Sequence, residues 1–217
     1  MNRIALVSLV FLCGFTGLVS ASDADWRLDK DKDGIKIYTR KIEGSDIRQI
    51  RGTVEIKGRL SSVIALLQDP EYLAKANPLI AEAYVQERFS ETESLFYLEL
   101  DMPWPVTDRY GLLRRKIQQD PGTKVVTFTE VATTDDMPEK KGYIRIVQSK
   151  QQWILTPNAD GSVSLDTTSH TDPNGPIPAA VLNWISVVPT YDFVDKLREE
   201  IEAGGYADAE LSFIQEP

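Results

Sequence analysis

Hydrophobic and polar positions alternate along most of the chain, which is the pattern of β-strands with one buried face. The first clear case begins at Ile35, and the segment 46–58 continues it. Six later segments share β-branched or aromatic residues and turn signals at their ends, and they span 82–90, 94–102, 110–118, 124–132, 143–157 and 162–171. The pattern predicts two or three strands near the start of the chain and about six more in its second half.

Two segments between these groups of strands change to helical spacing. Apolar residues recur at helical intervals from Leu60 to Leu67. A second short helix is expected to begin at Pro70, which a first helical turn tolerates, and to end before 77–78. Ahead of the first strand, residues 25–28 are expected to form a short helical lead-in.

A longer helix is predicted near the end of the chain, from Ile177 to Ile201, where apolar residues fall close to one face. Its first half carries no charged residue, whereas the half that begins at Asp192 has a charged outer face. Pro189 is expected to kink the helix between the two halves, and Gly204 marks its end.

This order of elements predicts an α+β fold, in which one curved antiparallel sheet wraps around the long C-terminal helix. A sheet and a helix arranged in this way need not fill the space between them, and proteins hold hydrophobic ligands in such spaces. The uncharged half of the helix is also compatible with an ordinary solid core. We favour an internal apolar cavity and keep the solid core as the alternative.

The segment 1–21 has the layout of a secretory signal peptide, with a basic start, a short apolar run and small residues before a cleavage site after Ala21. Cleavage there would leave one domain over residues 22–217 and would remove Cys13, the only cysteine. The expected location is therefore the periplasm or the outside of the cell, for a domain held together without disulfides.

The chain is acidic, and its formal net charge of −9 becomes −10 when Arg3 is lost with the signal peptide. This charge argues against nucleic acid as a partner and against strong adhesion to anionic membranes. Any contact with a membrane would then be transient and would depend on apolar side chains.

Several stretches resemble the START domain, the StAR-related lipid-transfer module, in order and spacing. Two are rather specific, namely the Pro-Trp-Pro-Val-x-x-Arg stretch over 103–109 and the Asp-Pro-x-Gly-x-Ile-Pro turn over 172–178. The others are "DGIKIYTR" from Asp33, "LLQDPEYLAKANP" from Leu66, "YIRIVQSKQQWILTP" from Tyr143 and the C-terminal helix. One departure is Tyr110, which follows Arg109 where many members of the family carry an aspartate.

The resemblance implies a helix-grip fold with a tunnel under the last helix, which holds one lipid or similar hydrophobic molecule. The helix and the loops near it would gate the opening of this tunnel. We therefore expect a monomeric carrier or sensor of a hydrophobic ligand, without a cofactor, a metal or catalytic activity.

Large aromatic and charged side chains are the candidates for contact with such a ligand. Arg109 stands out because a cation that points into an apolar cavity needs a partner; the alternative is a surface arginine paired with a nearby aspartate. The candidate contact residues are Trp104, Arg109, Arg145, Trp153, His170, Trp184, Val188 and Tyr191. The candidate lid and hinge residues are Asp172, Gly175, Ile177, Pro178 and Val181. For each aromatic residue, plain core packing is the alternative.

His170 is the only histidine, and without a cysteine or a second histidine it has no partners for a typical metal site. A catalytic pairing with Ser169 is disfavoured because neighbours on a strand face opposite sides. We expect His170 at the hinge, facing the cavity mouth or bonded to a turn.

The segment from Asp29 to Gly34 imitates the start of a calcium loop, but Arg40 stands where a bidentate glutamate is required.

Two other functions remain open on the sequence alone. The chain could be a cyclase-like enzyme on the same frame, with Arg109, Glu99, Tyr97 and His170 as its acid–base groups. It could instead be an interaction module of the cell envelope whose cavity is vestigial and filled. Nothing in the residue spacing demands catalysis, so ligand binding is the favoured function.

Overall fold

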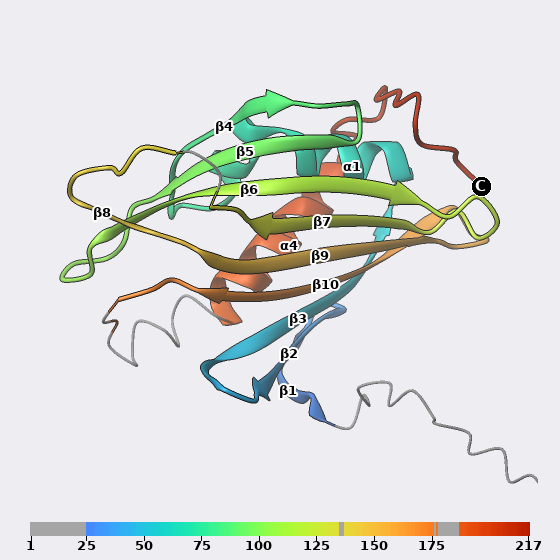
Figure 1. The fold of residues 1–217 in the computed structure, drawn as a ribbon. Coiled ribbons are helices and arrows are strands. Elements are labelled where there is room, and N and C mark those ends of the chain that lie inside the picture. The colour runs from blue at the N-terminus through green and yellow to red at the C-terminus, as the bar shows by residue number, and fades with distance from the viewer. Residues whose placement is uncertain (1–24, 135–136, 176, 178–186) are drawn as a thin grey trace, which may run out of the picture.

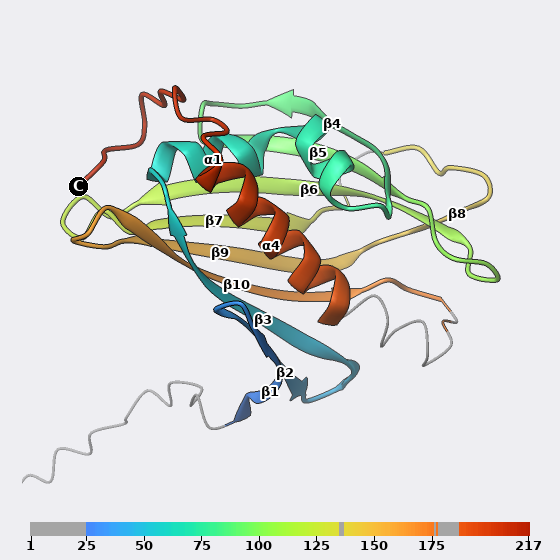
Figure 2. The same ribbon diagram turned by 180° about the vertical axis from the view of Figure 1, so that it is seen from behind.

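The computed structural model describes residues 25–134, 137–175, 177 and 187–217. Within these ranges, ten strands form one sheet and three helices lie on one face of it (Figures 1 and 2). The strands are β1 (Arg27–Lys32), β2 (Ile35–Ile42), β3 (Ser45–Lys57), β4 (Ile80–Arg88), β5 (Glu93–Leu100), β6 (Asp108–Gln119), β7 (Val126–Ala132), β8 (Tyr143–Arg145), β9 (Gln148–Pro157) and β10 (Ser162–Asp172). The helices are α1 (Leu60–Gln68), α2 (Pro70–Ala76) and α4 (Val187–Glu202). In this part of the chain, no helix is both long enough and apolar enough to cross a bilayer.

The strand order across the sheet is β1-β2-β3-β10-β9-β7-β6-β5-β4, and all these neighbours are antiparallel. The short strand β8 lies off this path and runs parallel to β6. The last strand, β10, pairs with β3 and so joins the two groups of strands into one curved layer. These features confirm the predicted α+β fold, with an antiparallel sheet around a C-terminal helix.

The helical lead-in predicted for 25–28 is wrong, because β1 begins at Arg27 and pairs with β2. Asp33 and Gly34 have positive φ values of 53° and 77°, which allow the tight hairpin between these strands. Pairing with β2 has therefore overridden the local helical preference of residues 25–28. The segment 29–34, which imitates a calcium loop, belongs to this hairpin. Among the residues described, no three or more His, Cys, Asp or Glu side chains are grouped to hold a metal ion.

The main hydrophobic core lies between the sheet and the helices. Its fully buried apolar residues include Ile35, Ile37, Ile56, Leu60, Val63, Ile64, Leu66, Val126, Leu155, Val194 and Leu197. The buried residues of α4, from Tyr191 to Ile201, recur at helical spacing and form one apolar stripe. This stripe positions α4 on β2 and β3, as Figure 2 shows from the helix side.

The end of α4 confirms the predicted stop signal. The amide of Gly205 donates to the carbonyl of Glu200 at 2.9 Å, and Gly204 has a φ of 92°, as in a Schellman-type helix end. Pro189 lies in the first turn of the described helix, where its missing N–H costs no hydrogen bond. Residues 178–186 lie outside the described part of the chain, so the kink stays a prediction.

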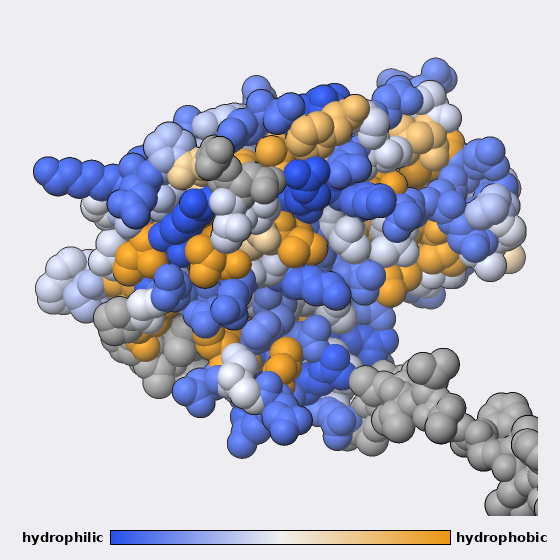
Figure 3. Space-filling model, in the orientation of Figure 1, coloured by the Kyte–Doolittle hydropathy of each residue, from blue (hydrophilic) through white to orange (hydrophobic). Residues whose placement is uncertain are grey.

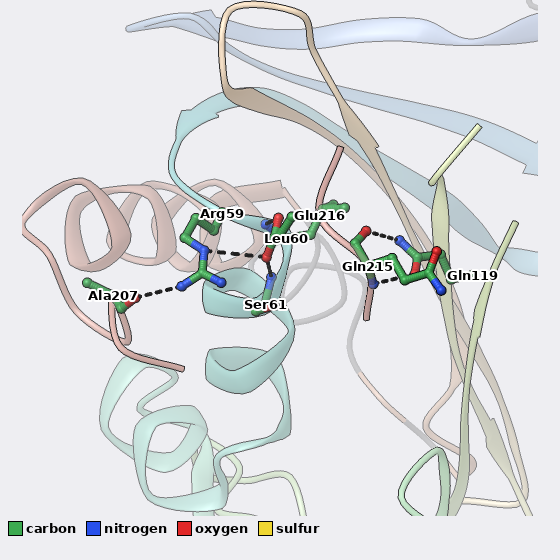
Figure 4. A network of polar contacts seen from close by, with 7 residues as sticks. All are labelled: Arg59, Leu60, Ser61, Gln119, Ala207, Gln215 and Glu216. Carbon is green, nitrogen blue, oxygen red and sulfur yellow. Dashed lines mark hydrogen bonds and ion pairs between the residues drawn. The ribbon is translucent and has the colours of Figure 1, made fainter. Parts of the chain in front are cut away.

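The segment after α4 folds back over the N-terminal end of α1, and Figure 4 shows the contacts. The Glu216 carboxylate accepts hydrogen bonds from the amides of Leu60 (3.1 Å) and Ser61 (2.9 Å), at a helix end that has no side-chain cap of its own. Gln215 and Gln119 exchange two hydrogen bonds of 2.8 Å. A carboxylate at this position satisfies free amides and complements the positive end of the helix dipole.

On the outer face of the sheet, residues 137–142 are anchored by a buried glutamate. Glu99 accepts hydrogen bonds from the Tyr97 hydroxyl and from the Lys140 ammonium. The amide of Lys140 also donates to the Tyr110 hydroxyl at 3.1 Å. Burial acts to raise the pKa of Glu99, but the hydrogen bonds from Lys140 and Tyr97 outweigh it and hold this pKa below its usual value.

The face of the molecule that Figure 3 shows is mostly hydrophilic, with scattered apolar residues between the charged ones.

Replacing Glu216 with alanine should lower the free energy of unfolding by about 0.5–2 kcal/mol, because α1 would lose its only side-chain cap. Urea denaturation followed by circular dichroism measures this difference. Glu210→Ala is the matched control, since Glu210 is an exposed carboxylate of the same segment. Equal stability of the two variants would contradict the capping role.

Replacing Glu99 with glutamine should change how stability depends on pH. Because the pKa of Glu99 is lowered in the folded protein, its contribution is present above the unfolded value of about 4.3 and is lost as the pH falls through the folded pKa. The difference in unfolding free energy between wild type and Glu99→Gln should therefore be largest near neutral pH and should shrink below about pH 4. Glu87→Gln, at an exposed site on β4, should show no such change.

Candidate ligand-binding pocket

A pocket of about 300 Å³ lies between the sheet and the first turns of α4. One wall is apolar, because β5 and β6 direct Phe96, Leu98, Leu100 and Leu113 to this side at every second position. Leu79, Ile80, Met102 and Ile146 extend this apolar wall. A pocket of this size lies at the lower end of the range that small-molecule sites occupy, and its extension as an internal tunnel under the C-terminal helix stays a prediction.

The opposite wall is polar but uncharged. Strands β9 and β10 direct Ser149, Gln151, Ser169 and Thr171 into the pocket, and these residues face one another across the two strands. The hydroxyls of Ser149 and Thr171 are 2.7 Å apart and share a hydrogen bond. A ligand in this pocket would thus meet hydrocarbon on one side and hydrogen-bonding groups on the other.

A buried ion pair crosses the middle of the pocket wall. Arg115 on β6 donates from Nε to Glu130 on β7 at 2.7 Å, and the indole of Trp153 donates to the other carboxylate oxygen at 3.3 Å. The Arg115 guanidinium also lies 3.2 Å from the centre of the Phe96 ring. Burial lowers the pKa of Arg115, and the charge of Glu130 opposes that shift. The two charges neutralise each other, so the pocket offers no strong net charge at this point.

Trp153 is the one aromatic candidate that the structure places in the pocket wall, with 4% of its surface exposed. Ile177, a candidate lid residue, is half-buried. Contact of either residue with a ligand stays a prediction. The other lid candidates Pro178 and Val181, and the contact candidate Trp184, lie outside the described residues.

Three other apolar candidates are not among the described residues of the pocket wall, so their contact with a ligand stays a prediction. Trp104 is 92% exposed, because it sits in the loop between β5 and β6 with prolines on both sides. Val188 is also exposed, on the solvent side of α4. Tyr191 is buried, but it packs under Lys30 and donates its hydroxyl to Asp33 at 3.1 Å, away from the pocket.

Arg109 is fully buried, but its partners are backbone carbonyls of the protein and not a ligand. It donates to the carbonyl of Pro173 at 3.2 Å, to that of Asn174 at 2.8 Å and to that of Thr107. Burial lowers its pKa, and the charge of Asp108 opposes that shift. The alternative of a surface ion pair is therefore wrong, and Arg109 ties β6 to the turn after β10. Contact of Arg109 with a ligand stays a prediction.

The turn that Arg109 holds contains the two predicted hinge residues that the structure describes. Asp172 accepts a hydrogen bond from the amide of Asn174 at 2.8 Å. Gly175 has a φ of 72°, and a Cβ atom there would come within 3.0 Å of Ile144. The glycine is thus required both by its conformation and by its close packing against β8.

Arg145 and His170 are also not among the described residues of the pocket wall, and their contact with a ligand stays a prediction. The Arg145 guanidinium donates to the carbonyl of Thr133 at 3.4 Å. His170 lies 3.2 Å from the Ser45 hydroxyl at the β2–β3 turn, because its neighbours on β10, Ser169 and Thr171, take the pocket side. Of the two positions expected for His170, the bond to a turn is the observed one.

The pair Arg115 and Glu130 is the functional feature that sequence reasoning missed. A signal was available, since Gly111, Leu113 and Arg115 share one face of β6 by simple alternation. The next residue, Arg114, faces outward and pairs with Glu93 at 2.9 Å. The adjacent residues Arg114 and Arg115 therefore face opposite sides of the sheet, and only the register of β6 decides which of them faces the pocket.

Replacing Arg109 with methionine should lower the free energy of unfolding by about 2–4 kcal/mol, because three carbonyls would lose a charged donor in a buried place. Arg109→Lys should recover only part of this loss, since an ammonium cannot reproduce the fork of the guanidinium. Trp104→Ala is the control and should change stability by no more than about 0.5 kcal/mol. A methionine variant as stable as the wild type would contradict the role of Arg109 in holding the turn.

The comparisons with known proteins agree with this architecture. The family model described as "START domain" matches residues 8–203. An uncharacterized protein of Pseudomonas aeruginosa is 29% identical over 178 residues, which cover 82% of this chain and 87% of that protein. The phosphatidylcholine transfer protein of Rattus norvegicus is 25% identical over 165 residues, covering 74% and 76% of the two chains.

Solved structures show the same fold. The crystal structure of a STAR-related lipid transfer protein from Xanthomonas axonopodis has a TM-score of 0.74 and 33% identity, and the match covers 82% of this chain and 98% of that one. The human StAR-related lipid transfer protein 5 has a TM-score of 0.75 at 14% identity, over 85% and 89% of the chains. The sheet with its C-terminal helix is thus the helix-grip fold, and this chain belongs to the START domain family.

Proposed function

We propose that this protein binds a lipid or similar hydrophobic small molecule in the pocket beneath α4 and acts as a periplasmic carrier or sensor of that molecule. START domains bind lipids or other hydrophobic ligands, and the similar protein from Rattus norvegicus is named for the transfer of phosphatidylcholine. The observation that carries the proposal is the pocket itself, with its continuous apolar wall from β5 and β6.

Transfer of hydrocarbon from water to this wall would supply the binding energy. Each buried CH₂ group contributes about 0.8 kcal/mol, so even a short chain gains several kcal/mol before the cost of immobilisation is subtracted. The pocket does not need a charged anchor for such a ligand. The polar wall of β9 and β10 would instead orient the ligand, because the polar end of the ligand would face this wall and its hydrocarbon end would face β5 and β6.

The proposed location rests on the N-terminal segment. Residues 1–21 have the order of basic, apolar and small residues that directs export. Without Cys13, the exported domain would contain no thiol, and the folded part of the chain is held by its core and by polar contacts.

We favour a carrier over a cyclase-like enzyme on the evidence of the charged groups. The described pocket wall contains three charged side chains, Arg48, Arg115 and Glu130. The last two are engaged with each other, and Arg48 donates to the Thr39 hydroxyl at 3.4 Å. His170 is on the opposite face of β10 from the pocket. No pair of these groups is placed as a free acid and base toward a bound substrate.

Transient contact with a membrane is part of the proposal, and Trp104 supports it. Its ring is exposed in the loop between Leu100, the last residue of β5, and β6, and this loop also contains Met102; Leu100 and Met102 both belong to the apolar wall. Tryptophan is favoured at the boundary between lipid and water, where one side of the ring is wet. An acidic protein would depend on such a residue, because its net charge gives little attraction to anionic lipids.

Replacing Leu98 with aspartate should reduce the lipid that co-purifies with the protein by about tenfold or more, because an unpaired carboxylate would stand in the apolar wall. Native mass spectrometry of protein isolated from its own cells measures the bound lipid and identifies it. Val131→Asp is the control, since Val131 is an exposed apolar residue on the outer face of β7. Circular dichroism shows that each variant is folded. Unchanged lipid content in a folded Leu98→Asp protein would overturn the proposed function.

A further inference from the structure

A smaller hollow of about 160 Å³ adjoins the main pocket directly beneath the start of α4. The two spaces share eight wall residues, so one ligand can occupy both. The described wall of the smaller hollow consists of Ile50, Asn77, Leu79, Gln151, Trp153, Thr167, Ser169, Pro189, Thr190, Phe193 and Val194. This set contains both polar and apolar side chains, and no charged side chain is among the described members.

Among the described residues of this wall, Thr167 is the one with a fully buried hydroxyl that lacks a partner. Its side chain is 3% exposed, and within the described structure its hydroxyl oxygen makes no hydrogen bond. A buried hydroxyl without a partner costs about 1–3 kcal/mol relative to one that is bonded. Native proteins seldom keep such a group unless a water, an ion or a ligand supplies the missing partner.

The packing around Thr167 places this residue under α4. On β3 its cross-strand neighbour is Gly52, where an added Cβ would come within 3.3 Å of the Thr167 methyl group and 3.6 Å of the Thr190 methyl group. The absence of a side chain at position 52 therefore makes room for both threonines between the sheet and the helix. The Thr167 methyl packs there, which leaves its hydroxyl on another side of the Cβ atom.

The hydroxyl belongs to a row of neutral polar groups that runs from the smaller hollow into the main pocket. Thr167, Ser169 and Thr171 take alternate positions on β10, and Gln151 on β9 faces Ser169. Hydroxyls and amides can both donate and accept hydrogen bonds, so they match a ligand group such as a hydroxyl, an ester carbonyl or an amide.

A charged group would be poorly placed here. Burial of a phosphate or a carboxylate without a countercharge costs several kcal/mol, and the described wall of the smaller hollow contains no cation. Of the two cations in the wall of the main pocket, Arg115 is neutralised by Glu130, and Arg48 is not among the residues of the smaller hollow. The smaller hollow thus favours an uncharged ligand end over the ionised headgroup of a phospholipid.

We propose that the smaller hollow, with Thr167 as its hydrogen-bonding anchor, binds the neutral polar end of an amphiphile whose hydrocarbon part lies against β5 and β6. The ligand class is an uncharged lipid that carries hydroxyl, ester or amide groups at one end, as an acylglycerol does. This inference rests on the proposed binding function and specifies which ligands the pocket selects.

The test compares three probes with the same acyl chain, which are 1-oleoylglycerol, oleate and 1-oleoyl-lysophosphatidate. Each is titrated into the delipidated full-length protein by isothermal titration calorimetry below its micelle concentration. The neutral probe should bind at least about tenfold more tightly than either anion. Thr167→Val should weaken binding of 1-oleoylglycerol by about threefold to tenfold, the value of one hydrogen bond, and should leave oleate unaffected.

Thr168→Val is the matched control, because Thr168 is the next residue on β10 and faces away from the pocket. It should leave the affinity for all three probes unchanged. A second measurement uses the ligand-free protein, in which Thr167→Val should raise the melting temperature, since it removes a buried hydroxyl without a partner. If the Thr167 hydroxyl instead made a structural hydrogen bond in the ligand-free protein, the same substitution would lower the melting temperature.

The outcomes separate the two proposals. Tighter binding of an anionic probe, or equal binding of 1-oleoylglycerol by wild type and Thr167→Val, would overturn the neutral-headgroup inference and leave the hydrophobic pocket standing. A lower melting temperature of ligand-free Thr167→Val would also overturn it. If none of the probes binds and Leu98→Asp leaves the co-purified lipid unchanged, the proposed function itself fails.

Discussion

Strand alternation is the constraint on which the rest of this structure depends. Because neighbouring residues on a strand face opposite sides of the sheet, each strand presents every second side chain to the space beneath α4. On β5 and β6 these side chains are mainly apolar, and on β9 and β10 most of them are polar and uncharged. A slip of one residue on β6 would turn Arg115 to the outer face and would bring Arg114 or Lys116 to the pocket side.

Among the described residues, several buried charged groups are satisfied within the protein, whereas the buried hydroxyls of Thr167 and Tyr72 are not. Arg109 is held by carbonyls of the turn after β10, Glu99 by Lys140 and Tyr97, and Arg115 by Glu130. Each of these groups stabilises a connection or a wall and leaves little capacity for chemistry on a ligand. Thr167 differs, because its hydroxyl has no partner within the described residues. The structure therefore supports selective binding more strongly than catalysis.

Most of the fold could be predicted from the sequence, because period-2 and period-3.6 patterns are local properties of the chain. The candidate site could be predicted only in part. The pocket lies near the C-terminal helix with Trp153 in its wall, whereas Trp104 is exposed and Arg109 is bonded to backbone carbonyls. Which of these residues contacts a ligand stays a prediction. Trp104 and Arg109 lie in a motif that marks the family, yet residue type alone does not tell whether a side chain meets a ligand, solvent or backbone carbonyls.

The sequence by itself determined most of the order of strands and helices and the end of α4 at Gly204, because these follow from spacing between near neighbours. Only the tertiary structure decided that Arg115 meets Glu130, that Glu216 caps α1 and that Thr167 is left without a partner. These contacts join residues that are brought together by strand pairing and by the C-terminal segment folding back over α1. Their geometry depends on register and packing across the whole sheet, which no local pattern encodes.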